Sequence, residues 1–398
     1  MDQSGKRMRH ALRFAACVAA MFAATGAIAA PFLPTDDAQV LERLPSRNTP
    51  QLRSLKTLQA AAAQAPRDLA RATALATSYI RASRVEGDPR FLGYAQGALG
   101  PWWKDPEAPT AVLILRATIR QSRHEFVPAI ADLGKVLQRE PRNAQALLTR
   151  ATVLTVQGKY AAARGDCNRL SGLVPDIYPV ICVAAIDSLT GKAGSAYDTL
   201  QRALLALPRI DRAGRVWGET LLGEIAHRRS DPAAEGHFRA ALDAGGREYY
   251  LLGAYSDWLL DHGRAADVIA LLQNETRIDP LLLRLALAQQ ALQRPAAAAS
   301  IDTLRARFDA SHARGDTVHQ RENARFELFL RDDARSALAL ALLNWKVQRK
   351  PADLRILADA AAAAGDAAAI GIVKQWLAET GFEYPVVAAL IGDKGAPK

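Results

Sequence analysis

Few side chains in this sequence are spaced for catalysis or for binding a metal. The stretch "RHEFVP" begins like the helix of a zinc protease, but Pro128 stands where the second histidine would have to be. His312, His319 and Glu322 form the closest remaining cluster of metal-ligating types, and a Gly-Asp turn interrupts the helix that would align them. We therefore expect no metal site and no cofactor.

Other catalytic signatures are also incomplete. The stretch "TGKAGS" at 190–195 contains Gly-Lys without the upstream glycine of a phosphate-binding loop. No Gly-x-Ser-x-Gly elbow occurs, and the scattered Asp and Glu residues cannot be paired into an acid–base dyad from their spacing. We predict that the protein is not an enzyme. A site assembled from distant residues is the remaining catalytic alternative.

The first thirty residues have the order of a secretory signal peptide: basic, then apolar, then small. Four basic residues precede an apolar stretch of about 17 residues that starts at Phe14, and the Ala-Ile-Ala at 27–29 resembles a cleavage site. An uncleaved membrane anchor is the alternative, but the stretch is marginal for spanning a bilayer. We predict that residues 1–29 are removed. The mature chain, without an integral membrane span, would then be soluble and exported, to the periplasm if the source is Gram-negative.

The charge is modestly basic. The net charge is +10, and loss of residues 1–29, which carry a net +3, would leave +7. The basic residues form no run and no stripe interleaved with aromatics, so we expect no nucleic-acid partner. A solubilising mixed surface is the favoured interpretation, and attraction of an anionic polymer is the alternative.

The composition favours helices. Hydrophobic residues make up 49% of the chain but aromatic residues only 6%, and Ala and Leu supply most of the apolar mass. These side chains lose little rotamer freedom in a helix. No run of alternating β-branched and aromatic residues suggests a sheet, so we predict an all-α protein.

The apolar pattern repeats every 34 residues after position 108. The segments "APTAVLILRATIRQSRHEFVPAIADLGKVLQREP" and "RNAQALLTRATVLTVQGKYAAARGDCNRLSGLVP" align in register. Each carries an apolar face at helical spacing, a turn signal and a second apolar face. One helical hairpin cannot bury these faces alone, so neighbouring hairpins must stack. The aligned residues are Leu113 with Leu147, Ala117 with Ala151, Phe126 with Tyr160, Ala129 with Ala163, and Pro141 with Pro175.

This pattern resembles the tetratricopeptide repeat family. The resemblance rests on the small residues Ala117, Ala151, Ala184, Ala129, Ala163 and Ala196, the aromatics Phe126 and Tyr160, the closing prolines, and the turn glycines Gly158, Gly191 and Gly263. It implies an α-solenoid of stacked antiparallel hairpins in a right-handed superhelix, whose first helices line a concave groove for a peptide or protein segment. The chain departs from the family at His124, which replaces a turn glycine, and at Arg116 and Arg150, which occupy a usually apolar site.

The repeat suggests an organisation for the whole chain. We expect a signal peptide at 1–29, an N-terminal extension with a helix at 30–66, a divergent hairpin at 67–106, three clear repeats at 110–208, two further repeats at 215–282, divergent helical repeats at 283–390, and a disordered tail at 391–398.

Opposite charges recur at a fixed spacing within the repeats. Arg116 and Asp132 are sixteen residues apart, as are Arg150 and Asp166. The alignment places the members of each pair on the two helices of one hairpin. We predict that they form partly buried ion pairs that fix the hairpin register, since an uncompensated buried charge would be costly.

Two cysteines remain after the predicted cleavage. Cys167 falls on the second helix of one repeat and Cys182 on the first helix of the next, and such helices touch in a solenoid. An even number of cysteines in an oxidising compartment favours a disulfide. Two buried thiols are the alternative.

The first helices contain residues whose helical phase points to the groove. Around the central repeats these residues are uncharged and of small or moderate size. Such a surface suits an extended peptide better than a highly charged ligand. We predict an exported scaffold that binds a protein or peptide, in envelope assembly or secretion. An adaptor for an anionic polymer or polysaccharide export system is the alternative. The candidate groove residues are Arg81, Arg84, Trp103, Ile114, Thr118, Gln121, Gln145, Leu148, Thr152, Tyr178 and Ile181.

Trp102 and Trp103 lie in the connection between the divergent hairpin and the first clear repeat. We expect one ring to cover the hydrophobic seam between repeats, where a large apolar area contributes strongly, and the other ring to be more exposed.

Overall fold

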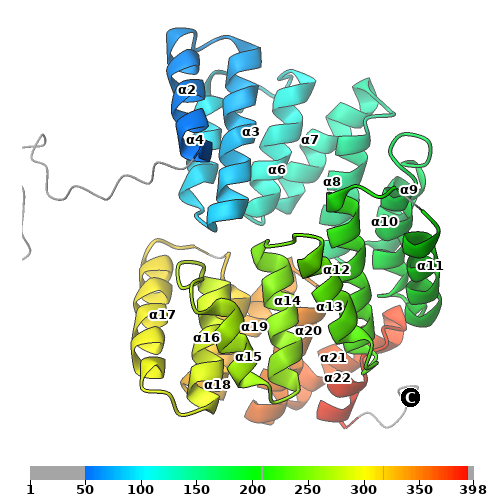
Figure 1. Cartoon of the computed structure of the whole chain (residues 1–398), viewed down its shortest axis with the longest axis vertical. Coiled ribbons are helices and arrows are strands. Elements are labelled where there is room, and N and C mark those ends of the chain that lie inside the picture. The colour runs from blue at the N-terminus through cyan, green and yellow to red at the C-terminus, as the bar shows by residue number, and fades with distance from the viewer. Residues whose placement is uncertain (1–49, 208, 317, 393–398) are drawn as a thin grey trace, which may run out of the picture. The chain divides into compact units, whose positions relative to one another are not determined.

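The described residues, which are 50–207, 209–316 and 318–392 of a computed structural model, form helices and no strands (Figure 1). A leading helix, α2 (Pro50–Gln64), is followed by nine antiparallel helical hairpins and by α22 (Pro385–Leu390). Consecutive hairpins pack on one another, so the predicted all-α solenoid of stacked hairpins is confirmed.

The hairpins pair helices that adjoin in the sequence. Their first helices are α3 (Leu69–Glu86), α6 (Thr110–Ser122), α8 (Ala144–Val156), α10 (Ile177–Asp187), α12 (Arg212–Arg228), α14 (Tyr249–Asp261), α16 (Asp279–Ala291), α18 (Gln320–Leu330) and α20 (Pro351–Ala364). Their second helices are α4 (Arg90–Ala98), α7 (Phe126–Arg139), α9 (Tyr160–Asn168), α11 (Ala193–Ala206), α13 (Ala234–Asp243), α15 (Ala265–Leu272), α17 (Ala296–Ala313), α19 (Ala334–Val347) and α21 (Ala367–Thr380). The short α5 (Gly100–Trp103) follows the first hairpin.

Every one of these hairpins has a residue in the left-handed conformation at the turn between its helices. Glycine adopts this conformation most easily because it has no Cβ, and five turns use it: Gly87, Gly158, Gly191, Gly263 and Gly365. The other four turns hold His124, Ser230, Gln293 and Asp332, with φ between 51° and 60°. The turn geometry therefore recurs where the glycine signal is missing from the sequence.

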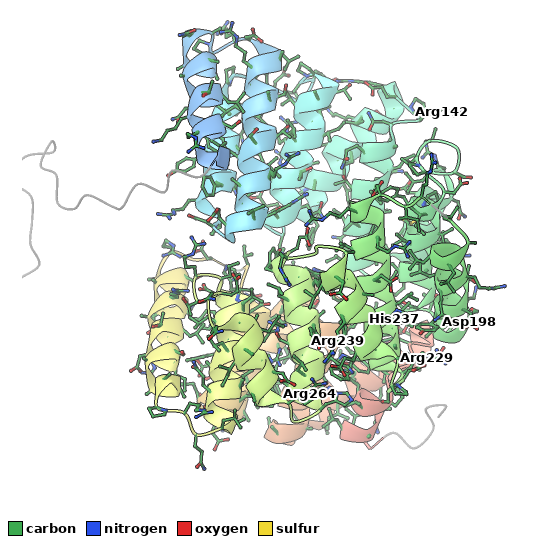
Figure 2. The ribbon with its side chains drawn as sticks, in the orientation of Figure 1. Arg142, Asp198, Arg229, His237, Arg239 and Arg264 are labelled. Carbon is green, nitrogen blue, oxygen red and sulfur yellow. A yellow bond between two sulfur atoms is a disulfide. The ribbon has the colours of Figure 1, made fainter. Side chains whose placement is uncertain are left out.

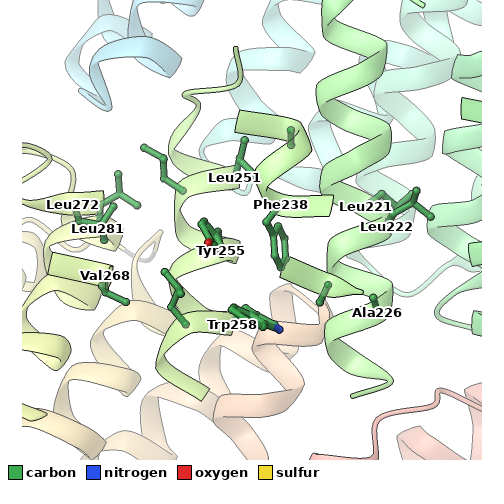
Figure 3. Packing of buried hydrophobic residues seen from close by; sticks show 14 of the residues in the cluster. Leu221, Leu222, Ala226, Phe238, Leu251, Tyr255, Trp258, Val268, Leu272 and Leu281 are labelled. Carbon is green, nitrogen blue, oxygen red and sulfur yellow. The ribbon is translucent and has the colours of Figure 1, made fainter. Parts of the chain in front are cut away.

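Aromatic side chains fill the contact between the middle hairpins. Phe238, Tyr255 and Trp258 of α13 and α14 stack in series, with 5.6 Å and 6.1 Å between successive ring centroids (Figure 3). Gly223 of α12 permits this packing, because a Cβ at that position would lie 2.8 Å from the Phe238 ring. Burial of these large apolar surfaces stabilises the stack of hairpins.

The last hairpins pack against the turns of earlier ones. The backbone N–H of Arg349 donates a hydrogen bond of 2.8 Å to the carbonyl oxygen of Val156, at the end of α8. Gly191 and Gly381 approach each other backbone to backbone, because a Cβ on Gly191 would lie only 3.2 Å from the Gly381 carbonyl oxygen. The described solenoid therefore closes on itself, and its first helices face an interior hollow.

Two predicted boundaries differ from the observed helices. The boundary at 282/283 is wrong, because it falls inside α16, a continuous helix of a regular hairpin. The predicted disordered tail begins at residue 391, but Ile391 is 5% exposed and packs in the C-terminal core, because it follows α22 directly. The predicted signal peptide at 1–29, the extension as far as residue 49 and the tail residues 393–398 lie outside the described residues.

Candidate functional site

The first helices of the early hairpins surround a cavity of about 360 Å³, which we call the apolar chamber. Side chains of α6, α8, α10, α12 and α14 line it, together with Phe126 at the start of α7, and Lys350 and Pro351 close one side at the start of α20. Its volume lies in the range typical of ligand-binding pockets. The apolar wall is formed by Phe126, Leu148, Val156, Leu189, Trp217 and Leu221.

A few polar groups are set into this apolar wall. Tyr250 donates a hydrogen bond of 2.7 Å to the Glu224 carboxylate. Tyr250 is 54% exposed, but this exposure is to the interior hollow, where protein surrounds the ring. Burial raises the pKa of Glu224, and Arg228 opposes this effect. Arg228 itself donates to the Ser188 hydroxyl at 3.0 Å. These groups can orient the amides of a bound chain.

A second cavity, of about 340 Å³, is lined by the first helices from α12 to α20 and by Tyr384. We call it the charged chamber. Its wall carries equal numbers of arginines and carboxylates, which are Arg284, Arg321, Arg325, Arg355, Asp257, Asp261, Glu322 and Asp359.

Asp257 is the centre of one ion-pair network in the charged chamber. Arg284 and Arg325 each approach its carboxylate to 2.5 Å. Burial alone would raise the pKa of Asp257, but the two guanidinium groups lower it below its usual range. Glu322 behaves in the same way. Burial acts to raise its pKa, but the nearby Arg321 guanidinium group outweighs burial and lowers the pKa to about 2. Carboxylates that arginines hold in the ionised form are unsuited to act as general acids near neutral pH.

The structure brings three of the predicted groove residues together in the apolar chamber. Gln121, Leu148 and Thr152 all line it, from α6 and α8. Arg84 lies close by and shares a neighbouring cavity with Gln121. Arg81 faces a small depression beside α2 instead. Gln121, Leu148 and Thr152 therefore share one cavity, and Arg81 lies apart from it.

Other predicted groove residues have different positions. Ile181 is 0% exposed and Thr118 is 8% exposed, so both are buried between helices, and Ile114 packs against the N-terminal core. The prediction of a groove position is wrong for Ile181 and Thr118, because neighbouring helices cover both side chains. Ile114 is half-buried. Gln145 is exposed at the start of α8 and donates to the Thr149 hydroxyl at 3.0 Å.

Tyr178 lies beside the apolar chamber without lining it. Its hydroxyl donates to the Asp211 carboxylate at 2.8 Å, and its ring contacts Trp217 at 6.1 Å between centroids. Burial, followed by the hydrogen bond to Asp211, raises the pKa of Tyr178 to about 12. Tyr178 therefore supports Trp217, which does line the chamber.

Both charge pairs that the spacing predicted are close in the structure. Arg116 lies 2.7 Å from Asp132, and Arg150 lies 2.7 Å from Asp166, each through two guanidinium nitrogens. The Arg116 pair is almost fully buried, and Arg120 adds a third nitrogen at 2.7 Å from Asp132. Such bidentate pairs fix the relative position of two helices.

Arg116 also binds the backbone of the segment that contains Trp102 and Trp103. The spacing of Arg116 in the sequence did not predict this second role. Its Nη1 donates to the carbonyl oxygens of Trp103 at 2.7 Å and Asp105 at 2.9 Å. The rings of Trp102 and Trp103 are both half-buried against the N-terminal core, and Arg120 lies over Trp103 at 5.6 Å from the ring centroid. The expected contrast between one buried and one exposed ring is therefore wrong, because both rings cover the seam.

Cys167 and Cys182 are joined by a disulfide in the structure. Their Cα atoms lie 5.6 Å apart, on α9 and α10, which belong to consecutive hairpins. Both residues are buried, and Cys182 also borders the apolar chamber. The bond therefore covalently connects the outer part of one hairpin to the wall of the chamber.

Sequence reasoning missed the parts of the site that come from the last hairpins. Lys350, Pro351 and the part of the charged chamber on α18 and α20 lie after position 282, where the 34-residue period fades. Arginines and acids spaced one turn apart on first helices, such as Arg321 with Arg325 and Asp257 with Asp261, were the available signal.

The described part of the chain offers neither a metal site nor a membrane span. Within it, no group of three His, Cys, Asp or Glu side chains could hold a metal ion. No helix there combines the length and apolar character needed to span a bilayer.

Comparisons with known proteins give only distant likenesses. No family model matches the chain, and no curated protein matches it. The chain is similar to the crystal structure of a tetratricopeptide repeat protein from Parabacteroides merdae, with 16% identity and a TM-score of 0.34, over 72% of this chain and 98% of that one. It is also similar to the Cut9–Hcn1 hetero-tetramer of the APC/C, with 16% identity and a TM-score of 0.41, over 82% of this chain and 52% of that one. At these values, neither likeness carries an argument about function.

Proposed function

We propose that this chain is a non-enzymatic scaffold that holds an extended segment of a partner protein in the apolar chamber. The observation that carries the proposal is the chamber itself, an apolar cavity of about 360 Å³ on the concave side of five consecutive first helices. Stacked helical hairpins commonly present such concave surfaces to partners.

The wall of the chamber suits a peptide better than a flat partner surface. Leu148, Trp217 and Leu221 offer apolar contacts for the side chains of a bound segment. Gln121 and Thr152 stand among them with amide and hydroxyl groups that can hydrogen-bond to a peptide backbone. This combination of mostly apolar walls with a few placed polar groups is typical of binding sites.

We further propose that the scaffold acts outside the cytoplasm, in envelope assembly or secretion. The order of residues 1–29 supports export. The Cys167–Cys182 disulfide also supports it, because disulfides persist in oxidising compartments.

No comparable observation favours an adaptor for an anionic polymer. Arg239 and Arg264, which lie close together near α13 and α15 (Figure 2), each approach Glu235 to 2.7 Å. The arginines of the charged chamber are likewise paired with carboxylates. Much of the basic side-chain charge is therefore already compensated.

Site-specific photo-crosslinking tests the proposed function. A benzophenone amino acid placed at Thr152, which lines the chamber, should crosslink to partner segments in cells that express the protein. The matched control is the same probe at Ala162, an exposed position on α9. Trp217→Ala should reduce crosslinking from position 152, because the ring forms part of the wall. The proposal fails if positions 152 and 162 capture the same proteins, or if position 152 captures none.

A further inference from the structure

A third cavity, of about 310 Å³, differs from the two chambers in its charge. It lies between the end of α3, the turn after α6, the starts of α14 and α16, and Lys350 before α20. We call it the cationic pocket, and its polar lining residues are Ser83, Arg84, Gln121, Ser122, His124, Tyr249 and Lys350.

The residues that line the cationic pocket include two cations and no carboxylate. This contrasts with the charged chamber, where each arginine faces an acid. Two acids lie at the end of α3 and just after it, and both pair with other arginines: Glu86 with Arg277 at 3.2 Å, and Asp88 with Arg90 at 2.7 Å. The cations of the pocket therefore lack a compensating charge within its wall.

Lys350 is a half-buried cation whose ammonium forms no ion pair with a described residue. Burial, followed by repulsion from Arg321, lowers the pKa of this ammonium group. The three carboxylates whose charges act on Lys350 already accept hydrogen bonds. Glu224 accepts from Tyr250, Glu322 from Arg321, and Asp353 from Asn344 and from the backbone N–H of Lys350. Arg84 is exposed and also forms no ion pair among the described residues. An anion bound between Arg84 and Lys350 would supply the opposite charge that both side chains lack.

Neutral donors complete the wall of the pocket. The side chains of Ser83, Gln121 and Tyr249 form no hydrogen bond with another described residue, so their donors are available. His124 lies 3.3 Å from the Gln348 amide through Nδ1. The amide nitrogen can only donate, so Nδ1 is the acceptor. The single N–H of the neutral ring is therefore on Nε2, which is a further donor. An oxygen-rich anion could accept hydrogen bonds from several of these groups at once.

We propose that the cationic pocket binds a small oxyanion, such as a phosphate, sulfate or carboxylate group, between Arg84 and Lys350. The two cations come from the first hairpin and from the start of the ninth, so a bound anion joins distant parts of the solenoid. Gln121 and Lys350 also border the apolar chamber, which places the anion at one end of it. The inference does not depend on the proposed function, because the ion alone tests it.

Calorimetric titration of the whole protein with inorganic phosphate, at constant ionic strength set with chloride, tests this site. Wild type should bind phosphate, and Arg84→Gln and Lys350→Met should each weaken binding about tenfold or more, because each removes a charge-assisted contact. The matched controls are Arg81→Gln, one turn away on α3, and Lys374→Met on α21, both exposed cations outside the pocket. These controls should bind as wild type does.

Parallel titrations with sulfate, acetate and glycerol phosphate identify the group that binds. Preference for glycerol phosphate over inorganic phosphate would indicate an anion carried by a larger molecule, and binding of acetate alone would indicate a carboxylate. Each of these results supports the oxyanion site if the Arg84 and Lys350 variants weaken that binding about tenfold or more. The inference is overturned if wild type binds none of the four anions, or if Arg84→Gln, a change at an exposed side chain, binds them as wild type does.

Discussion

Gly158 lies against the indole of Trp376, so closely that a Cβ on Gly158 would collide with the ring. The contact joins the turn of the third hairpin to α21 of the ninth. Arg349 reinforces it, because its backbone binds the Val156 carbonyl and its guanidinium group lies 5.0 Å from the centroid of the Trp376 indole. These contacts enclose the apolar chamber, since Lys350 follows directly in the chain.

Substituting Gly158 by Ala should weaken this closure. The matched control is Gly263→Ala, at the same position of another hairpin turn, with a φ of 68° and no atom within 4 Å of the added Cβ. The control should lose about 1–2 kcal/mol from the left-handed conformation alone. Gly158→Ala should lose about 1–3 kcal/mol more because of overpacking. Denaturant unfolding would measure both, and equal losses would contradict the closure contact.

Removing Arg150 should leave the buried Asp166 with only its longer contact to Arg169, at 3.6 Å. The two side chains share hydrogen bonds of 2.7 Å through Nε and Nη2, and Asp166 is almost fully buried. We expect Arg150→Leu to destabilise the protein by about 3 kcal/mol, and the double variant Arg150→Leu with Asp166→Leu to recover part of that loss. Equal melting temperatures of wild type and Arg150→Leu would refute a structural role for the pair.

The disulfide should be present in protein that has been exported. Peptide mapping without reductant should find Cys167 linked to Cys182. A double Cys→Ser variant should lose about 3 kcal/mol of stability, as expected for a loop of this length. Free thiols in the native exported protein would contradict this prediction.

Stability should fall on mild acidification because His124 stays neutral in the folded state. Burial, followed by the charge of Lys350, lowers the pKa of His124 to about 4, against about 6.5 in an unfolded chain. As the pH falls from 6.5 to 4, the unfolded state gains a proton that the folded state does not bind, and up to about 3 kcal/mol of stability is lost.

Urea unfolding between pH 7 and pH 4 would measure this loss. The matched variant is His124→Asn, because asparagine lacks the titrating group and tolerates the left-handed conformation that His124 adopts at φ 60°. The slope of stability against pH should be smaller in the variant. An unchanged slope would assign the acid sensitivity to other groups.

The 34-residue period made the hairpins of the first half predictable from sequence. There, small residues such as Ala117 and Ala151 recur where helices approach closely, and both are almost fully buried. The signal faded after position 282 although the hairpins continue, partly because the left-handed turn residues are Gln293 and Asp332 instead of glycine. The backbone geometry persisted while its usual sequence marker was lost.

The candidate site was only partly predictable for a related reason. Gln121, Leu148 and Thr152 could be chosen by helical phase, because each belongs to a first helix with a clear apolar face. Ile181 and Thr118 satisfy the same criterion but are buried. Helical phase predicts the direction in which a side chain points, but it does not predict how far a neighbouring helix covers that side chain.

The sequence by itself determined the helical hairpins, their stacking order and the Arg116–Asp132 and Arg150–Asp166 pairs. All of these join residues within one hairpin or in adjacent hairpins, where spacing along the chain fixes proximity. Only the tertiary structure decided that Trp376 meets Gly158 and that Lys350 and Arg84 line the same pocket. The physical reason is that such contacts depend on the accumulated small rotations of many successive hairpins, which no local sequence pattern encodes.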